Sequence, residues 1–298
     1  MTDITPNLNI AVAEEIPPST VMQGVVKFFR TKPLGATGAV VVVLFILMAI
    51  FAPLIAPYDP EIPNYEVMMD PPSAQHWMGV DEFGRDLLSR IIFGARTAMA
   101  IGLIASFVGS TLGLIIGVSS AYFGGWVDMI VQRILDVFMA FPLIILALAI
   151  VSIGGAGVQS VIIAIIVPFT PRAARVVRSS ALAIREVPYV DAARALGFSH
   201  WRIIYRHMLP NVMAPYLIML TAFMGQAVLL EASLSFLGLG VNEPTPAWGL
   251  MLQGGAELYA ETMPWVPIYP GLAITLSVFA FNLFGDSLRD VLDPRLRI

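Results

Sequence analysis

The sequence contains no cysteine and little charge. Asp, Glu, Lys and Arg make up 13% of the 298 residues, against roughly a quarter in soluble globular proteins. The lack of cysteine excludes disulfides, thiolate metal sites and cysteine nucleophiles. The lack of charge excludes an ordinary soluble domain and argues against nucleic acid as a partner. With 57% hydrophobic residues and a mean hydropathy of +0.80, the chain is better divided into membrane spans of about 20 residues each.

Lysine is almost absent, and this limits the chemistry. The only lysines are Lys27 and Lys32, both ahead of the first long apolar run. No glycine-rich loop ends in Gly-Lys-Ser/Thr, so any ATP that drives this protein must be bound and hydrolysed by another polypeptide. Neither Gly-x-Ser-x-Gly nor His-Glu-x-x-His occurs, and the three histidines, His76, His200 and His207, are scattered. The sequence therefore predicts no catalytic residues and no metal site.

Long apolar runs dominate the rest of the chain. The predicted spans are approximately 34–56, 97–123, 132–153, 157–178, 209–231 and 263–285. We therefore predict an all-α, polytopic membrane protein with six transmembrane helices, in which a segment 1–33 precedes a transmembrane domain 34–298. In the second span, Gly109, Gly113 and Gly117 form small-xxx-small steps, which predict close packing against another helix.

The distribution of basic residues predicts the orientation. Of the 17 lysine and arginine residues, only Arg85, Arg90 and Arg96 fall on one side of the six predicted spans. We expect the protein in the inner (plasma) membrane of the cell. The positive-inside rule then puts segment 1–33, both termini and the loop after span four in the cytoplasm. The external segment 58–96 carries seven acids. These are Asp59, Glu61, Glu66, Asp70, Asp81, Glu82 and Asp86. They either receive a soluble partner or are simply solvated, and the pattern does not favour one reading.

The loop 184–211, between spans four and five, is too amphipathic to be a linker. Pro188 favours a helix start, and Gly197 allows the chain to bend before a second short helix. Val190, Ala193 and Leu196 or Gly197 share one face at helical spacing. We expect this face to form a compact knob that fits a groove in another protein.

The same loop contains a spaced motif. It reads Asp191-Ala192-Ala193, three residues, Gly197, nine residues, then His207, one residue, Leu209 and Pro210. This pattern resembles the EAA loop of ABC importer permeases, which has Glu and Ile where this chain has Asp191 and His207. The resemblance implies that the loop is a coupling helix that docks on an ATPase subunit. It assigns ATPase coupling to Asp191, Ala192, Ala193, Gly197, Leu209 and Pro210.

Four further stretches narrow the resemblance. They are GVDEFGRDLLSRIIFGAR (79–96), YFGGWVDMIVQRILDVFMAFP (122–142), EASLSFLGLGVNEPTPAWGLML (231–252) and FNLFGDSLRDVLDPRLR (281–297). Together they resemble the C-type permease of dipeptide and oligopeptide importers, which nickel importers also resemble. The resemblance implies a homologous B-type permease, two cytoplasmic ABC ATPases that hold ATP and Mg, and a periplasmic or extracellular substrate-binding protein. It implies no enzyme activity and no cofactor on this chain.

Glu231 stands out because it follows a long uncharged run at the expected outer end of span five. An ionisable side chain there is a candidate for the translocation pathway, although a carboxylate in the external headgroups or beside a neighbouring subunit fits as well. Two rival functions remain open. A self-sufficient channel or ion-coupled carrier is expected to show several paired intramembrane acids, and a non-conducting scaffold subunit to bind partners without any solute flux.

Overall fold

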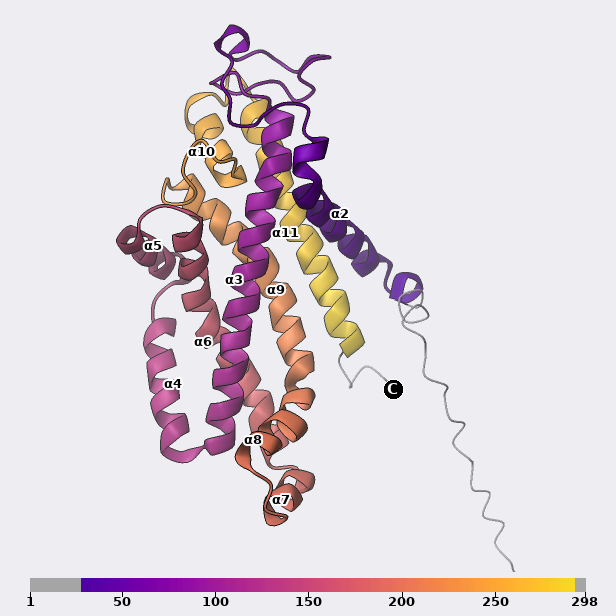
Figure 1. The fold of residues 1–298 in the computed structure, drawn as a ribbon, viewed down its shortest axis with the longest axis vertical. Coiled ribbons are helices and arrows are strands. Elements are labelled where there is room, and N and C mark those ends of the chain that lie inside the picture. The colour runs from indigo at the N-terminus through magenta and orange to yellow at the C-terminus, as the bar shows by residue number, and fades with distance from the viewer. Residues whose placement is uncertain (1–27, 293–298) are drawn as a thin grey trace, which may run out of the picture.

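The computed structural model describes residues 28–292, and this part of the chain is helical without any β-sheet (Figure 1). The long helices are α2 (Pro33–Ile55), α3 (Leu87–Phe123), α6 (Val158–Arg185), α9 (Leu209–Phe236) and α11 (Trp265–Leu292). The shorter ones are η1 (Tyr65–Val67), α4 (Gly125–Met139), α5 (Leu143–Gly154), α7 (Pro188–Ala195), α8 (His200–Ile203), the π-helical η2 (Ile204–Met208) and α10 (Trp248–Leu258). Most of the predicted segment 1–33, including Lys27, lies outside the described residues.

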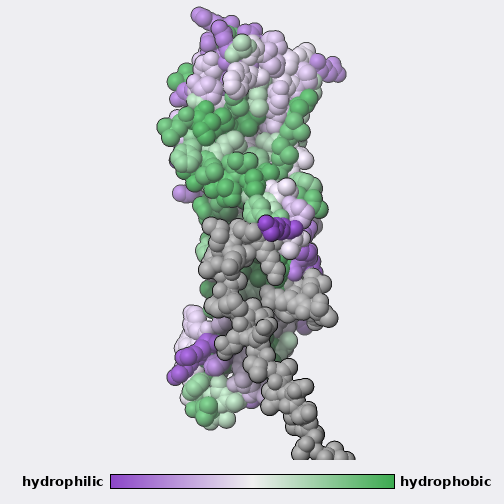
Figure 2. All heavy atoms as spheres, turned by 90° about the vertical axis from the view of Figure 1, so that its right-hand side faces the viewer, coloured by the Kyte–Doolittle hydropathy of each residue, from purple (hydrophilic) through white to green (hydrophobic). Residues whose placement is uncertain are grey.

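Five helices are long and apolar enough to cross a membrane. They are α2, α3, α6, α11 and the continuous helix His200–Phe236, which joins α8, η2 and α9. The pair α4 and α5 makes a sixth span if it is counted as one. In Figure 2 the apolar side chains form a green band below a paler end of the molecule. The all-α membrane fold is thus confirmed.

The third predicted span, 132–153, is wrong as a single helix. The chain breaks between α4 and α5, whose axes differ by 86°. The cause is Pro142, which disfavours the helical conformation of the residue before it and has an extended ψ of 136° itself. Arg178 and Arg175 of α6 pair with Asp128 and Asp136 of α4, so α4 is tied alongside α6. The second break, between the predicted spans 132–153 and 157–178, is confirmed and lies between α5 and α6.

Helix α3 runs through the middle of the bundle, and its glycine face packs as predicted. A Cβ atom on Gly113 would lie 2.4 Å from Ala173 Cβ of α6, and one on Gly117 would lie 2.6 Å from the carbonyl oxygen of Ala174. Neither distance is tolerable for a real side chain, so glycine is required for this approach. Close contact of this kind, with its van der Waals gain, is what holds apolar helices together in lipid.

Several predicted boundaries move. Helix α3 begins at Leu87 rather than at residue 97, and α6 continues to Arg185 instead of ending at residue 178. Helix α10 was not predicted. It lies in the loop after α9, where Trp248 is fully buried and donates its indole N–H to the carbonyl oxygen of Ile91 at 3.0 Å. A short helix of this kind shows no span-length apolar run, so hydropathy could not find it.

The two ends of the bundle are polar. At one end, residues 56–86 and 237–247 form a loop-rich cap, drawn at the top of Figure 1 beside α10. At the other end, α7 lies beyond the end of α3, at the bottom of Figure 1, and α8 begins the long helix His200–Phe236. The two regions lie at opposite ends of α3, as expected if they lie on opposite sides of a membrane.

Candidate functional site

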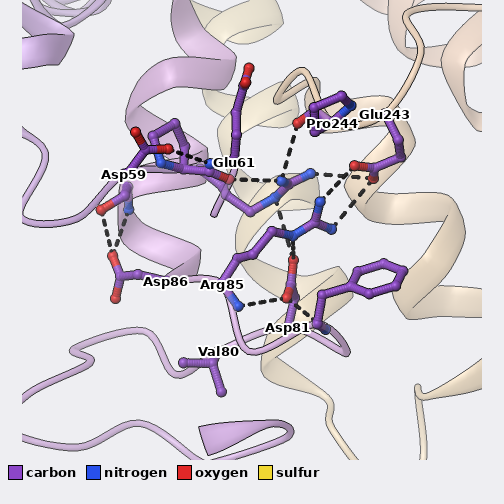
Figure 3. A network of polar contacts seen from close by, with 12 residues as sticks. Asp59, Glu61, Val80, Asp81, Arg85, Asp86, Glu243 and Pro244 are labelled. Carbon is purple, nitrogen blue, oxygen red and sulfur yellow. Dashed lines mark hydrogen bonds and ion pairs between the residues drawn. The ribbon is translucent and has the colours of Figure 1, made fainter. Parts of the chain in front are cut away.

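The cap is held together by two buried arginines (Figure 3). Arg85 donates from Nε to Asp81 Oδ2 at 2.7 Å and from Nη1 to Glu243 Oε2 at 2.6 Å. Arg90, which is 1% exposed, donates from Nη1 to the carbonyl oxygen of Pro60 at 2.9 Å and lies 3.4 Å from Glu243 Oε1. Glu243 therefore joins the segment after α9 to the segment before α3.

Two of the seven acids of segment 58–96 are buried and paired within the chain. Asp81 and Asp86 are each 3% exposed. Asp86 caps α3 by accepting from the backbone N–H of Ser89 at 2.8 Å, and its other oxygen lies 2.9 Å from Nδ1 of His76. This cap explains why α3 begins at Leu87, since an aspartate at the N-cap satisfies an otherwise unpaired amide.

Arg85 remains charged despite its burial. Burial opposes the charge, but the hydrogen bond to Glu243 and the charge of Asp81 outweigh it, so the pKa of Arg85 lies above its ordinary value. The spacing of Asp81 and Arg85, four residues apart, was the available sequence signal for part of this network. The contribution of Glu243 had no such signal because it is distant in the chain.

Glu82, in the cap, lies against Gly254 of α10, and burial raises the pKa of its carboxyl above the ordinary 4.5. A raised pKa means that folding disfavours the ionised carboxylate. The charge of Glu82 therefore lowers the stability of the folded state at a pH above the ordinary pKa of the group, and has no such effect at a pH below it. We expect Glu82→Gln to raise the melting temperature by about 1–2 °C at about pH 7.5 and to have no effect at about pH 4. The exposed Glu66→Gln is the matched control. An equal effect of Glu82→Gln at both pH values would contradict this expectation.

At the opposite end, the 184–211 segment folds as helices on either side of a glycine turn. Helix α7 begins at Pro188, as predicted, and Gly197 has a φ of +74°, which residues other than glycine and asparagine rarely adopt. The hydroxyl of Ser199 then caps α8 by accepting from the backbone N–H of Arg202 at 3.4 Å. The predicted bend is confirmed, but the helix that follows it is not short, because it continues from His200 into α9.

The exposed face of α7 differs from the predicted knob. Val190 and Ala193, which are 0% and 3% exposed, pack against α3, α6 and η2 of the same chain. The residues that face outward are Asp191, Ala192 and Leu196, of which Leu196 is 73% exposed. The prediction for Val190 and Ala193 is therefore wrong, because an amphipathic helix turns its most apolar face to its own core.

The end of the motif lies at the start of α9. Leu209 is half-buried against the core that also receives α7, and Pro210 is exposed in the first turn of α9. The helix does not start afresh at residue 209, since η2 joins α8 to α9 without a break. Two residues that flank the motif connect its ends. The hydroxyl of Tyr189, before Asp191, accepts a hydrogen bond from Nδ2 of Asn211, after Pro210, at 3.1 Å.

Glu231 is completely buried in the half of α9 nearer the cap. Its Oε1 accepts from the hydroxyl of Ser235 at 2.8 Å, and its Oε2 has no partner among the described residues. A groove beside it, of about 330 Å³, is lined by other residues. They are Leu229, Ala232, Ser233, Phe236, Leu237, Leu252 and Ile274. The carboxylate thus faces the interior of this subunit, and its place on a pathway stays a prediction.

Within residues 28–292, no group of three or more His, Asp or Glu side chains is arranged to hold a metal ion.

Two family matches cover most of the chain. Residues 109–298 match the family described as binding-protein-dependent transport system inner membrane component. Residues 20–75 match the N-terminal transmembrane domain of oligopeptide transport permease C.

Named relatives and solved structures agree with these matches. The dipeptide transport system permease protein DppC of Alkalihalophilus pseudofirmus is 42% identical, over 91% of this chain and 89% of its own length. The glutathione transport system permease protein GsiD of Escherichia coli is 43% identical, over 90% of this chain and 89% of its own length. A solved inward-facing structure of the MetNI methionine ABC transporter shares the fold, with a TM-score of 0.56 at 20% identity, over 68% of this chain and 96% of that one. The chain therefore belongs to the binding-protein-dependent inner membrane components, the permease subunits of ABC importers, within their peptide-transport branch.

Proposed function

We propose that this chain imports di- or oligopeptides as one of two homologous permeases, driven by two cytoplasmic ATPases that bind ATP and Mg. The observation that carries the coupling role is the exposed face of α7 next to the Gly197 turn. The small side chain of Ala192 allows a partner to approach this face closely, Leu196 supplies an apolar contact, and Asp191 supplies a charge. Such a short, outward-pointing helix suits a groove on a partner.

We also propose an orientation in the membrane. The 184–211 segment and both termini would lie in the cytoplasm, in line with the concentration of lysine and arginine on that side. The cap would then face outward and receive the binding protein that delivers substrate. Transport is a shift between inward-open and outward-open states, in which ATP binding moves α7 together with its groove.

Peptides are the proposed substrate class because the relatives named above are a dipeptide and a glutathione permease. Glutathione is itself a tripeptide, so the two names share a chemical class. Uptake of labelled dipeptides, longer peptides and glutathione by the reconstituted complex would rank them. Preference for nickel or an opine over every peptide would refute this substrate class while leaving the permease role intact.

Purification of the tagged protein from its native membrane tests the proposal. We expect a second permease and ATPases carrying a P-loop to copurify, with ATPase activity, and association to fall when the 191–197 stretch is altered. A single species that transports solute without any ATPase would show a self-sufficient channel or carrier instead. A complete complex that moves no solute would show a scaffold.

Glu231 allows a separate prediction about the pathway. If its carboxylate contributes to a polar lining or gate, Glu231→Gln should lower peptide uptake about tenfold while ATPase association stays normal. The neutral amide keeps the size and can still accept the hydrogen bond from Ser235. Ser233→Ala, at a half-buried position of the same helix, is the control. Wild-type uptake, expression and substrate preference in Glu231→Gln would remove Glu231 from the pathway.

A further inference from the structure

Helix α3 is the stiffest connection between the two ends of the molecule. Its 37 residues correspond to about 56 Å of helix. Among the five candidate spans of the described chain, it alone contains no proline. The others contain Pro53 in α2, Pro168 and Pro171 in α6, Pro215 in α9 and Pro270 in α11. Because internal proline removes a backbone hydrogen bond and kinks a helix, α3 is the element best able to carry a displacement along its axis.

The end of α3 near the 184–211 segment is joined to α8 by two side chains. The hydroxyl of Tyr122 lies 2.8 Å from Nδ1 of His200, and the two rings meet edge to face at 5.6 Å. Tyr122 is only 6% exposed, so this hydrogen bond is shielded from water on the tyrosine side. Phe123 adds a second ring 5.9 Å from His200.

Two arginines complete this joint. The guanidinium of Arg194, from α7, lies 5.4 Å from the centre of the Tyr122 ring, within the range of a cation–π contact. Arg185, from the end of α6, donates to the carbonyl oxygen of Ala121 at 3.0 Å. Three successive helices, α6, α7 and α8, therefore all hold the last turn of α3.

The opposite end of α3 is anchored in the cap. Arg90 lies in its first turns and binds the carbonyl oxygen of Pro60 and the carboxylate of Glu243, which belong to the two separate segments of the cap. A displacement of α3 along its axis must therefore move the cap or break buried polar contacts. Both ends of this one straight helix are fixed, each to a different functional region.

We propose that Tyr122 and His200 are positioning residues, which pass the movement of the 184–211 segment to α3 and through it to the cap. This inference rests on the proposed function. Without the Tyr122–His200 hydrogen bond, α8 would hold α3 less firmly, and α3 would follow the movement of α7 and α8 less completely. ATP would then be hydrolysed with less transport.

The test is Tyr122→Phe in the whole transporter complex reconstituted in lipid vesicles, with uptake and ATP hydrolysis measured on the same preparation. The variant keeps the ring and loses only the hydroxyl. We expect peptide transported per ATP hydrolysed to fall about fivefold, the effect of losing one net hydrogen bond, with ATPase association unchanged.

Tyr216→Phe is the matched control. Tyr216 of α9 is also 6% exposed, and its hydroxyl lies 3.0 Å from that of Thr111 in the middle of α3, so its hydrogen bond involves neither α7 nor α8. Its loss should leave the transport-to-hydrolysis ratio unchanged. A purely structural role of buried tyrosine hydroxyls would instead affect both variants alike and would overturn the proposal.

A second variant identifies the partner. His200→Ala should lower the same ratio, and the double variant with Tyr122→Phe should lower it no further than the stronger single change, because both break one contact. A wild-type ratio in Tyr122→Phe, or full additivity in the double variant, would overturn the joint. If the unaltered complex neither binds ATPases nor transports, the proposed function itself is refuted, and the role of the joint with it.

Discussion

Replacing Gly197 by valine is expected to reduce ATPase association and coupled transport by about tenfold or more. Gly197 has a φ of +74° and no other group within 4 Å of the position its Cβ would occupy. The cost is therefore backbone strain, of order 1–3 kcal/mol for a β-branched residue in the left-handed region. This strain would be relieved by changing the angle between α7 and α8, which displaces the exposed face that carries Asp191. Copurification of the ATPases and peptide uptake measure the effect.

Gly197→Asn is the control for this prediction. Asparagine tolerates the left-handed conformation better than other non-glycine residues, and the open space leaves room for its side chain. We expect it to keep most of the activity. If asparagine and valine were equally harmful, bulk at the docking surface and not backbone conformation would explain the loss. If both were harmless, the turn would have no part in coupling.

Replacing Arg90 by methionine is expected to lower the melting temperature of the protein by about 10 °C. Methionine keeps an unbranched side chain but leaves the carbonyl oxygens of Pro60 and Pro244 without their buried donor. Removal of one member of a buried, hydrogen-bonded charge network costs about 3 kcal/mol or more, because its partners stay desolvated. A cost of this size corresponds to the stated shift for a chain of this length. Thermal unfolding in detergent measures it.

Arg96→Met provides the comparison. Arg96 lies further along the same helix and is exposed, so its replacement should change stability by less than about 0.5 kcal/mol. Equal melting temperatures for the Arg90 and Arg96 variants would show that the cap is not held by its arginines. Loss of binding-protein-dependent transport in Arg90→Met at a temperature where the variant is folded would add a role in transport.

Membrane class, most spans and the helix start and turn of the 184–211 segment followed from the sequence, since each depends on local chemistry. Pro188 and Gly197 mark a helix start and a turn whatever surrounds them. The glycine face of the second span likewise predicted close packing against another helix, and that helix is α6. One local signal was overlooked. Pro142 breaks the third span inside an apolar run that hydropathy treats as continuous.

The errors at the sites have a different origin. Val190 and Ala193 were placed correctly on one face of a helix, but periodicity does not say whether that face meets another protein or the chain's own core. For Asp81, the sequence likewise did not indicate whether an acidic side chain is exposed to solvent or buried within the fold. Asp81 is buried beside Arg85, which also binds Glu243, a residue 158 positions after Arg85 in the chain.

The sequence by itself determined the α-helical membrane class and most of the spans, because the bilayer selects for apolar length, which is a property of consecutive positions. The permease family followed from the spaced motifs that resemble ABC importer permeases, not from hydropathy. Only the tertiary structure decided which residues of α7 remain exposed, how Arg90 and Glu243 close the cap, and that Tyr122 meets His200 at the end of α3. Those contacts join residues distant in the chain, and their geometry exists only after the helices have packed.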